Sequence, residues 1–203
     1  MSSAGNAART IAFFVALMAT ALALGAAMAH ALELPNKIGM SREDYFVVQR
    51  IYAGWSRLGI LIGVEFAAML AVAILYRRRP RVLWPTLAAI GFLMAAQAVF
   101  WAFTFPANQA TADWTVQPDD WQALRRQWEY SHLAGAGLQA LAMASLIAAA
   151  LGRGMDGRDE RGHDEGWLDR QLRPTRAAPV KVGINHELSV MPVLVTGIHE
   201  DLP

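Results

Sequence analysis

The stretch Leu58–Tyr76 reads LGILIGVEFAAMLAVAILY and contains one charged residue, Glu65. A helix that rises about 1.5 Å per residue needs roughly 20 apolar residues to cross a hydrocarbon core of about 30 Å. Three further apolar runs have a similar length: Ile11–Ala29, Val82–Phe105 and Leu133–Leu151. The sequence therefore predicts an all-α membrane protein built on a four-transmembrane-helix bundle. The expected spans are residues 11–31, 56–76, 82–105 and 131–151.

The composition supports a membrane class and excludes several others. Hydrophobic residues make up 55% of the chain and charged residues 17%, so the lipid bilayer is the expected partner. The chain has no cysteine, which excludes disulfides, thiolate metal sites, iron–sulfur clusters and covalent c-type haem. A net charge of +1 without a nucleic-acid-binding motif predicts no nucleic-acid partner.

The chain is expected to form one membrane domain, residues 1–151, followed by a tail, residues 152–203. From Gly152 onward the composition shifts to charged residues, glycine and proline, which is typical of a flexible and largely disordered extension. Two short β-prone runs, 180–182 and 188–196, lie within this tail.

The distribution of basic residues predicts the orientation. Arginines cluster at 77–79 and 81, and further arginines precede the first apolar run and follow the fourth. The positive-inside rule places both termini in the cytoplasm, for a protein of a bacterial-type inner or plasma membrane. The connections 31–57 and 106–132 would then face outward. Six basic residues fall on that side: Lys37, Arg42, Arg50, Arg57, Arg125 and Arg126. Several of them have acidic neighbours with which they could pair, among Glu43, Asp44, Asp119, Asp120 and Glu129.

The first apolar run has a second interpretation. Ala27-Met28-Ala29 resembles a signal-peptidase cleavage site, which would remove the first span. The run is longer than the 7–15 residues of a usual signal core, so retention as the first helix is favoured.

Polar residues gather at the predicted outer ends of the helices. His30 and Glu33 are three residues apart, as are Glu129 and His132, so each pair shares one helix face. Glu65 lies about two turns inside the second span, where a carboxylate is costly unless it faces the bundle interior. These residues predict a polar site in the outer half of the bundle.

The same residues suggest three kinds of site. Glu-x-x-His on inward-facing helices holds paired metal ions in soluble four-helix bundles, so His30, Glu33, Glu129 and His132 could bind a non-haem iron, manganese, copper or zinc ion. Two imidazoles could instead be axial ligands of a b-type haem, although the neighbouring carboxylates disfavour this. The third interpretation is purely structural, with the polar groups bonding helices together.

Two further patterns concern packing. Trp114, Trp121 and Trp128 recur every seven residues and are interpreted as an aromatic belt at the membrane interface, with substrate stacking as the alternative. Gly135 and Gly137 predict close contact between the fourth span and a neighbouring helix.

The outer motifs resemble those of a known family. Pro106-Ala-Asn108, Trp114, and the segment from Trp121 through Arg126-Gln-Trp128-Glu129-x-x-His132 resemble the small four-helix membrane proteins that include the fungal anthrone oxygenases. Most bacterial members of that family have no assigned function. The resemblance covers roughly residues 10–151. It implies a four-helix membrane bundle and oxygenation of a phenolic polycyclic ketone to a quinone.

Three functional hypotheses follow. The first is a membrane oxidoreductase, or monooxygenase-like protein, acting on a small hydrophobic or quinone-like molecule. Its proton-transfer residues would be Glu65, Glu129 and His132, and its substrate-binding residues Tyr52, Asn108 and Trp128. The second is a non-enzymatic transport, accessory or envelope-scaffold protein. The third is an electron-transfer protein with a b-type haem.

Overall fold

The computed structural model describes residues 3–172, with side-chain surroundings for residues 4–154. The bundle lies in the first of two units, Met1–Gly162 and His163–Pro203. The α-helices of the described part are α1 (Ser3–Lys37), α2 (Arg42–Gln49), α3 (Leu58–Leu75), α4 (Pro80–Val99), α5 (Phe105–Ala110) and α6 (Trp121–Leu172). Two 3-10 turns, η1 (Arg50–Tyr52) and η2 (Trp55–Arg57), and a π-turn, η3 (Phe100–Thr104), complete the described helical structure.

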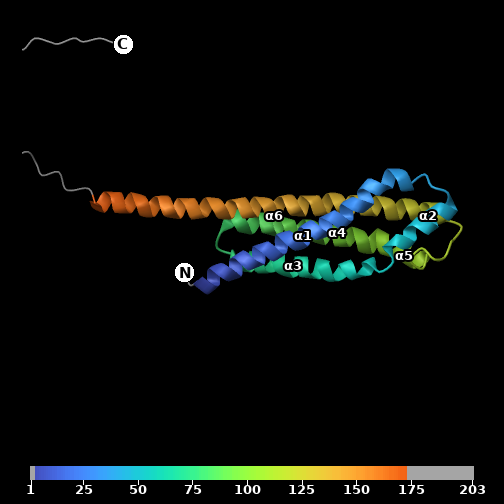
Figure 1. The fold of residues 1–203 in the computed structure, drawn as a ribbon, viewed down its shortest axis with the longest axis horizontal. Helices are drawn as coiled ribbons and strands as arrows, with labels where there is room; N and C mark the ends of the chain where they lie inside the picture. The colour runs from blue at the N-terminus through green and yellow to red at the C-terminus, as the bar shows by residue number, and fades with distance from the viewer. Residues whose placement is uncertain (1–2, 173–203) are drawn as a thin grey trace, which may run out of the picture. The chain divides into compact units, whose positions relative to one another are not determined.

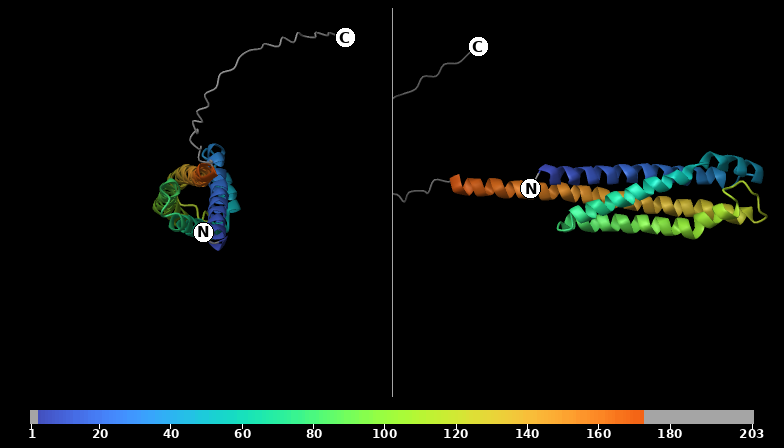
Figure 2. Two further views of the ribbon diagram at one scale, coloured as in Figure 1. Left: turned by 90° about the vertical axis from the view of Figure 1, so that its left-hand side faces the viewer. Right: turned by 90° about the horizontal axis from the view of Figure 1, so that it is seen from below.

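Four helical segments of the described part are long and apolar enough to cross a membrane: Ala4–Lys37, Trp55–Leu75, Pro80–Ala110 and Trp121–Gly154. They run alongside one another with alternating direction, as two views show (Figures 1 and 2). The prediction of an all-α four-helix bundle is therefore confirmed. The first, third and fourth segments extend beyond their predicted spans, mainly at the end of the bundle that carries the polar motifs.

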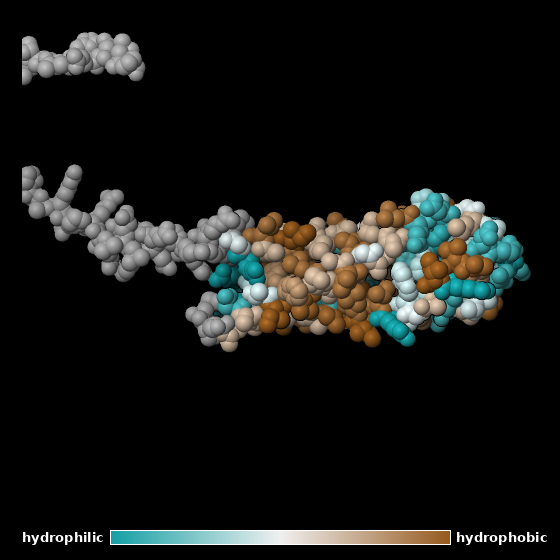
Figure 3. Space-filling view, viewed as in Figure 1, coloured by the Kyte–Doolittle hydropathy of each residue, from teal (hydrophilic) through white to brown (hydrophobic). Residues whose placement is uncertain are grey.

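The surface of the bundle suits a lipid environment. In the most apolar part of each spanning segment only 22–33% of the residues are buried, so most apolar side chains face outward. Large exposed side chains include Phe14, Ile60 and Leu141. Figure 3 shows an apolar band along the middle of the bundle with hydrophilic regions toward both ends. These features are compatible with an integral membrane protein.

Small residues and a few large ones build the interior. Ala16, Ala89 and Ala142 are fully buried, which lets the helix backbones approach one another. Met69 and Leu146 fill the remaining space in the same cluster. Helix α1 contributes Phe13 and Ala16 to this core, so it packs as an element of the bundle.

The glycine that allows close contact between helices is not one of those that the sequence predicts. A Cβ built on Gly135 or Gly137 would meet nothing within 4 Å, so that prediction is wrong. A Cβ on Gly152, by contrast, would lie 2.6 Å from the carbonyl oxygen of Arg81. Pro85 stands four residues after Arg81 in α4 and has no N–H to donate to that carbonyl. Glycine at 152 therefore permits the close contact of α6 with α4.

We call residues 30–57 and 104–132 the capped end. Here Ser41 caps the start of α2, and its hydroxyl accepts from the Asp44 N–H at 3.1 Å. The Arg42 guanidinium donates to the carbonyls of Gln117 (2.6 Å) and Pro118 (3.2 Å). The Arg125 guanidinium donates to the Met40 carbonyl at 2.9 Å. The two connections are thereby fastened to each other and to α6.

The connection after α5 contains a strained turn. Ala112, Asp113 and Trp114 have φ angles of 45°, 54° and 65°, in the left-handed region that costs an L-residue about 1–2 kcal/mol each. Thr111 holds the turn: its hydroxyl accepts from the Trp114 N–H at 3.1 Å, and its carbonyl accepts from the Val116 N–H at 2.9 Å. This conformation carries the Trp114 indole back toward α5.

The π-turn η3 lets α4 continue into α5 despite a proline. Pro106 lacks an N–H, and its ring would clash with the carbonyl of Ala102, four residues earlier, in an ideal helix. The wider turn avoids this conflict. Helix α6 supports the segment, because the Gln127 amide donates to the Phe103 carbonyl at 2.8 Å and the hydroxyls of Thr104 and Ser131 lie 2.7 Å apart.

Helix α6 continues from Gly152 to Leu172, a segment that the composition assigns to the tail. Residues 173–203, including both β-prone runs, lie outside the described residues, so the disordered tail stays a prediction.

Candidate functional site

The site begins with a helix that continues through a proline. Helix α1 includes Pro35 and ends at Lys37, which places His30 and Lys37 seven residues apart on one face. Lys37 is 2% exposed, and its Nζ lies 3.0 Å from Oε1 of Glu129, which is 1% exposed. Lys37 and Glu129 therefore form a buried ion pair that joins α1 to α6.

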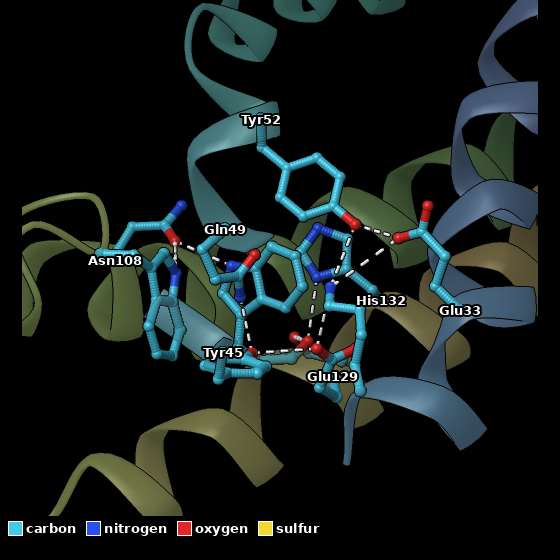
Figure 4. Close-up of polar contacts among 11 residues, drawn as sticks. Glu33, Tyr45, Gln49, Tyr52, Asn108, Glu129 and His132 are labelled. Carbon is cyan, nitrogen blue, oxygen red and sulfur yellow. Dashed lines mark hydrogen bonds and ion pairs between the residues drawn. The ribbon is translucent and has the colours of Figure 1, made fainter. Parts of the chain in front are cut away.

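Helix α2 adds hydroxyl and amide donors to this ion pair (Figure 4). The Tyr45 hydroxyl donates to Oε1 of Glu129 at 2.9 Å, and the Gln49 amide donates to the Tyr45 hydroxyl at 2.6 Å. Tyr45 and Gln49 are buried. Oε1 of Glu129 thus receives two hydrogen bonds, while its Oε2 and the Gln49 Oε1 are buried without a partner among the described residues.

A second arm of the network runs through Tyr52 toward the surface. Its hydroxyl accepts from Lys37 Nζ at 3.0 Å and donates to Oε2 of Glu33. The Glu33 side chain is 38% exposed, and its carboxylate lies 3.9 Å from Lys37 Nζ. Lys37 is therefore shared between a buried carboxylate and a half-exposed one.

Both tyrosines of this network are poor acids. Burial raises the pKa of Tyr45, and the charge of Glu129 and the hydrogen bond to it raise it further. Burial also raises the pKa of Tyr52, together with the hydrogen bond to Glu33. The two phenols therefore remain protonated donors at any physiological pH.

Because its pKa is raised, we expect Tyr45 in the folded protein to remain un-ionised at pH values where an ordinary tyrosine, with a pKa of about 10, ionises. Alkaline titration by tyrosinate absorbance should give equal amplitudes for the wild type and Tyr45→Phe when folded. In denaturant the variant should lose the amplitude of one tyrosine. A smaller amplitude for the folded variant would contradict this expectation.

The ammonium of Lys37 also lies against aromatic faces. Its Nζ is 4.6 Å from the ring centroid of Tyr52 and 4.6 Å from that of Trp128. Such contacts stabilise a cation by about 0.5–2 kcal/mol, depending on desolvation. The rings therefore compensate part of the cost of burying Lys37.

The two histidines of the predicted site are in direct contact. The ring centroids of His30 and His132 are 4.2 Å apart, and Trp128 lies 4.0 Å from His132 and 5.1 Å from His30. Nδ1 of His132 lies 2.9 Å from the Trp128 carbonyl, which can only accept. The proton must therefore be on Nδ1, and in the neutral ring Nε2 carries the basic lone pair. Nδ1 of His30 is buried without a partner among the described residues.

Asn108 clamps two indoles. Its Oδ1 accepts from Nε1 of Trp128 at 2.8 Å and from Nε1 of Trp114 at 3.2 Å. The side chain therefore fixes the ring of Trp128, which in turn contacts both histidines.

The aromatic-belt interpretation of the three tryptophans is wrong. Trp114, Trp121 and Trp128 are 6%, 9% and 3% exposed and pack with Tyr45 and Phe46 of α2. A belt would present its rings to lipid headgroups, whereas these rings form a second apolar core under α2. Trp121 and Trp128, seven residues apart, share one face of α6, whereas Trp114 reaches this core from the turn after α5.

The structure divides the predicted site into two clusters. His30, Glu33, Tyr52, Trp128, Glu129 and His132 lie together at the capped end, with Asn108 attached through Trp128. Glu65 belongs to another cluster, where it is fully buried and accepts from the Gln139 amide at 2.6 Å.

The capped end does not offer an evident metal site. Among the described residues, no three histidine, aspartate or glutamate side chains are arranged to hold an ion. Glu129 already binds an ammonium, which would repel a metal cation. The assignment of His30, Glu33, Glu129 and His132 as ligands of iron, manganese, copper or zinc therefore stays a prediction that this geometry does not favour.

The histidine pair does not fit a haem. Two axial imidazoles lie on opposite faces of the macrocycle, with the iron between them. Rings tilted by 49° at 4.2 Å between centroids leave no room for a porphyrin. We therefore derive no chemistry from a haem.

Sequence reasoning did not identify Lys37, Tyr45 or Gln49 as parts of the site. Lys37 is seven residues after His30, which places both on one helix face only if the helix continues past Pro35. That spacing could have indicated that Lys37 belongs to the site. Ser41 followed by Asp44 is an N-terminal capping pattern, which could have predicted α2, the helix that carries Tyr45 and Gln49.

The chain matches no family model, no curated protein and no solved structure.

Proposed function

We propose that this integral membrane protein binds a small planar phenolic or quinone-like molecule at the capped end and removes a proton from it. The observation that carries the proposal is the tautomer of His132, whose Nδ1 is bonded to a carbonyl and whose Nε2 is therefore a base. An imidazole fixed in this way among aromatic rings has the properties of a general base. The resemblance to the anthrone oxygenases supplies the substrate class.

Each neighbouring group has a role in such a reaction. His30, in ring contact with His132, is a second imidazole that can share the proton. The Tyr52 ring, which is only partly buried and lies beside Trp128, is where a planar molecule would stack. Lys37, whose Nζ lies 4.6 Å from the centroids of both rings, would stabilise negative charge on the substrate oxygen as the proton leaves.

The net reaction implied by the resemblance is balanced with molecular oxygen as the oxidant. The methylene carbon of the ketone loses two hydrogens and gains one oxygen atom, and the second oxygen atom leaves as water with those hydrogens. Proton removal from the methylene group is the step that His132 would catalyse.

We also propose that the capped end faces the outside of the cell and that the opposite end faces the cytoplasm. The opposite end carries three exposed arginines: Arg77 and Arg78 in the turn between α3 and α4, and Arg81 in the first turn of α4. The support is the positive-inside rule.

Anthrone is a suitable probe for the proposal. Detergent-purified protein should consume oxygen and form anthraquinone faster than buffer alone, and His132→Gln should lower that rate by about 10²–10⁴-fold. Ser145→Ala, which alters an exposed hydroxyl elsewhere on α6, is the matched control and should keep the rate. Absence of anthrone oxidation and of any quenching of tryptophan fluorescence by the probe would overturn the proposal.

A structural role is the second candidate, and the interhelical polar contacts favour it. Lys37–Glu129, Gln139–Glu65 and Thr104–Ser131 each join two different helices. A scaffold of this kind predicts that His132→Gln lowers thermal stability while the wild type binds no probe.

A further inference from the structure

The two fully buried glutamates of the bundle have different partners. Glu129 has the ammonium of Lys37 at 3.0 Å and the Tyr45 hydroxyl at 2.9 Å. Glu65 is 0% exposed, and its Oε1 accepts one hydrogen bond, from the neutral amide of Gln139 at 2.6 Å. Its Oε2 is buried without a hydrogen-bond partner among the described residues.

Residues from three helices surround Glu65. Gln139 on α6 is 4% exposed, and Thr20 on α1 is a fully buried neighbour of the carboxyl group. The Thr20 hydroxyl donates its proton to the Ala16 carbonyl at 2.8 Å, so its oxygen is left to act as an acceptor. Because this proton is committed to the Ala16 carbonyl, Thr20 does not also donate it to Glu65.

The free-energy cost of burying a charged carboxylate also favours a protonated Glu65. An isolated carboxylate in an apolar interior costs many kcal/mol, and such a group takes up a proton instead. Glu129 avoids this cost through Lys37, whereas the described partners of Glu65 are both uncharged. Gln139 supplies the hydrogen-bond donor that the carbonyl oxygen of a neutral acid accepts.

The position of this cluster separates it from the capped end. Gln139 lies seven residues after His132 on the same face of α6, which corresponds to about 10 Å along the helix axis. Ala136, 2% exposed, stands between them on that face. The apolar side chains Ala68 and Met69 follow Glu65 in α3 and belong to the bundle core.

We propose that Glu65, Gln139 and Thr20 form a second site, a proton-binding site in the middle of the bundle. Glu65 is the proton carrier and is a neutral carboxylic acid at neutral pH. Gln139 donates to its carbonyl oxygen, and Thr20 accepts from its hydroxyl. The site does not rest on the proposed function, because its proton is bound whether or not a substrate occupies the capped end.

Infrared spectroscopy tests this assignment directly, since a protonated carboxyl group and a carboxylate absorb at separate frequencies. Spectra of the detergent-purified protein in heavy water at about pH 7 should contain the carbonyl stretch of a protonated acid that is absent in Glu65→Gln. Ordinary glutamates, which titrate near pH 4.3, would be ionised under these conditions. Glu33→Gln is the matched control, and its difference spectrum should show the loss of carboxylate bands.

Thermal unfolding gives the second readout. Because glutamine is close in shape to a neutral glutamic acid, Glu65→Gln should keep the unfolding midpoint within a few degrees of the wild type. A difference spectrum in which Glu65→Gln loses carboxylate bands would overturn the proposal. So would carboxylate bands that shift when sodium is replaced by a bulky cation, which would indicate a metal-ion site.

Discussion

Replacing Lys37 by methionine is expected to lower the free energy of unfolding by about 3–5 kcal/mol. The substitution keeps the apolar stem of the side chain but removes the ammonium, and Glu129 would be left as a charge that is 1% exposed. Tyr45 would remain as one donor to that carboxylate. One neutral donor does not replace a cation at 3.0 Å, so most of the stabilisation is lost.

Unfolding midpoints in detergent, followed by circular dichroism, would measure this effect. Glu129→Gln should be similarly destabilising, because it leaves the ammonium of Lys37 buried without a carboxylate at that position. The double variant Lys37→Met/Glu129→Gln should recover part of the loss. Glu33→Gln, at a side chain that is 38% exposed, should cost no more than about 1–2 kcal/mol. Additive losses in the double variant would show that the pair is not coupled.

Replacing Gly152 by alanine is expected to destabilise the bundle by about 1–3 kcal/mol. The added Cβ would stand 2.6 Å from the Arg81 carbonyl oxygen and 3.2 Å from its carbon, both of them backbone atoms. Backbone cannot rotate away as a side chain can, so α4 and α6 would have to separate. The change would also alter the contact of α6 with the first turn of α4.

Gly154→Ala is the matched control for this prediction. It lies in the same helix, but nothing is within 4 Å of its added Cβ. Because alanine is the better helix former by about 0.5–1 kcal/mol, this variant should be slightly stabilised. The two substitutions should therefore move the thermal midpoint in opposite directions. Equal effects would mean that the close contact with Arg81 does not form.

Apolar length was sufficient to predict the four spans, because each membrane helix must satisfy its backbone hydrogen bonds internally and present apolar side chains to lipid. The lengths of the helices beyond the spans were not predictable in the same way. Helix α1 continues past Pro35 to Lys37, and α4 continues into α5 because the π-turn η3 accommodates Pro106.

The site was partly predictable for a related reason. The sequence predicted that His30 lies close to Glu33 and that Glu129 lies close to His132. Residues three apart on a helix share a face, so these two contacts follow from helix geometry alone. The partner of Glu129 comes from another helix, and Tyr45 is separated from it by 84 residues in sequence. Contacts of this kind depend on the packing of α2, which hydropathy does not specify.

The π-turn η3 has a consequence for the length of the chain. One extra residue in a helical turn rotates everything after it by about 100° relative to an uninterrupted α-helix. Ala107 is fully buried after that rotation, and Asn108 reaches both indoles. The number of residues in η3 thus determines which side of α5 faces α6. Deleting one residue from 100–104 should be more harmful than substituting any of them, because the deletion would turn the amide of Asn108 away from the tryptophans.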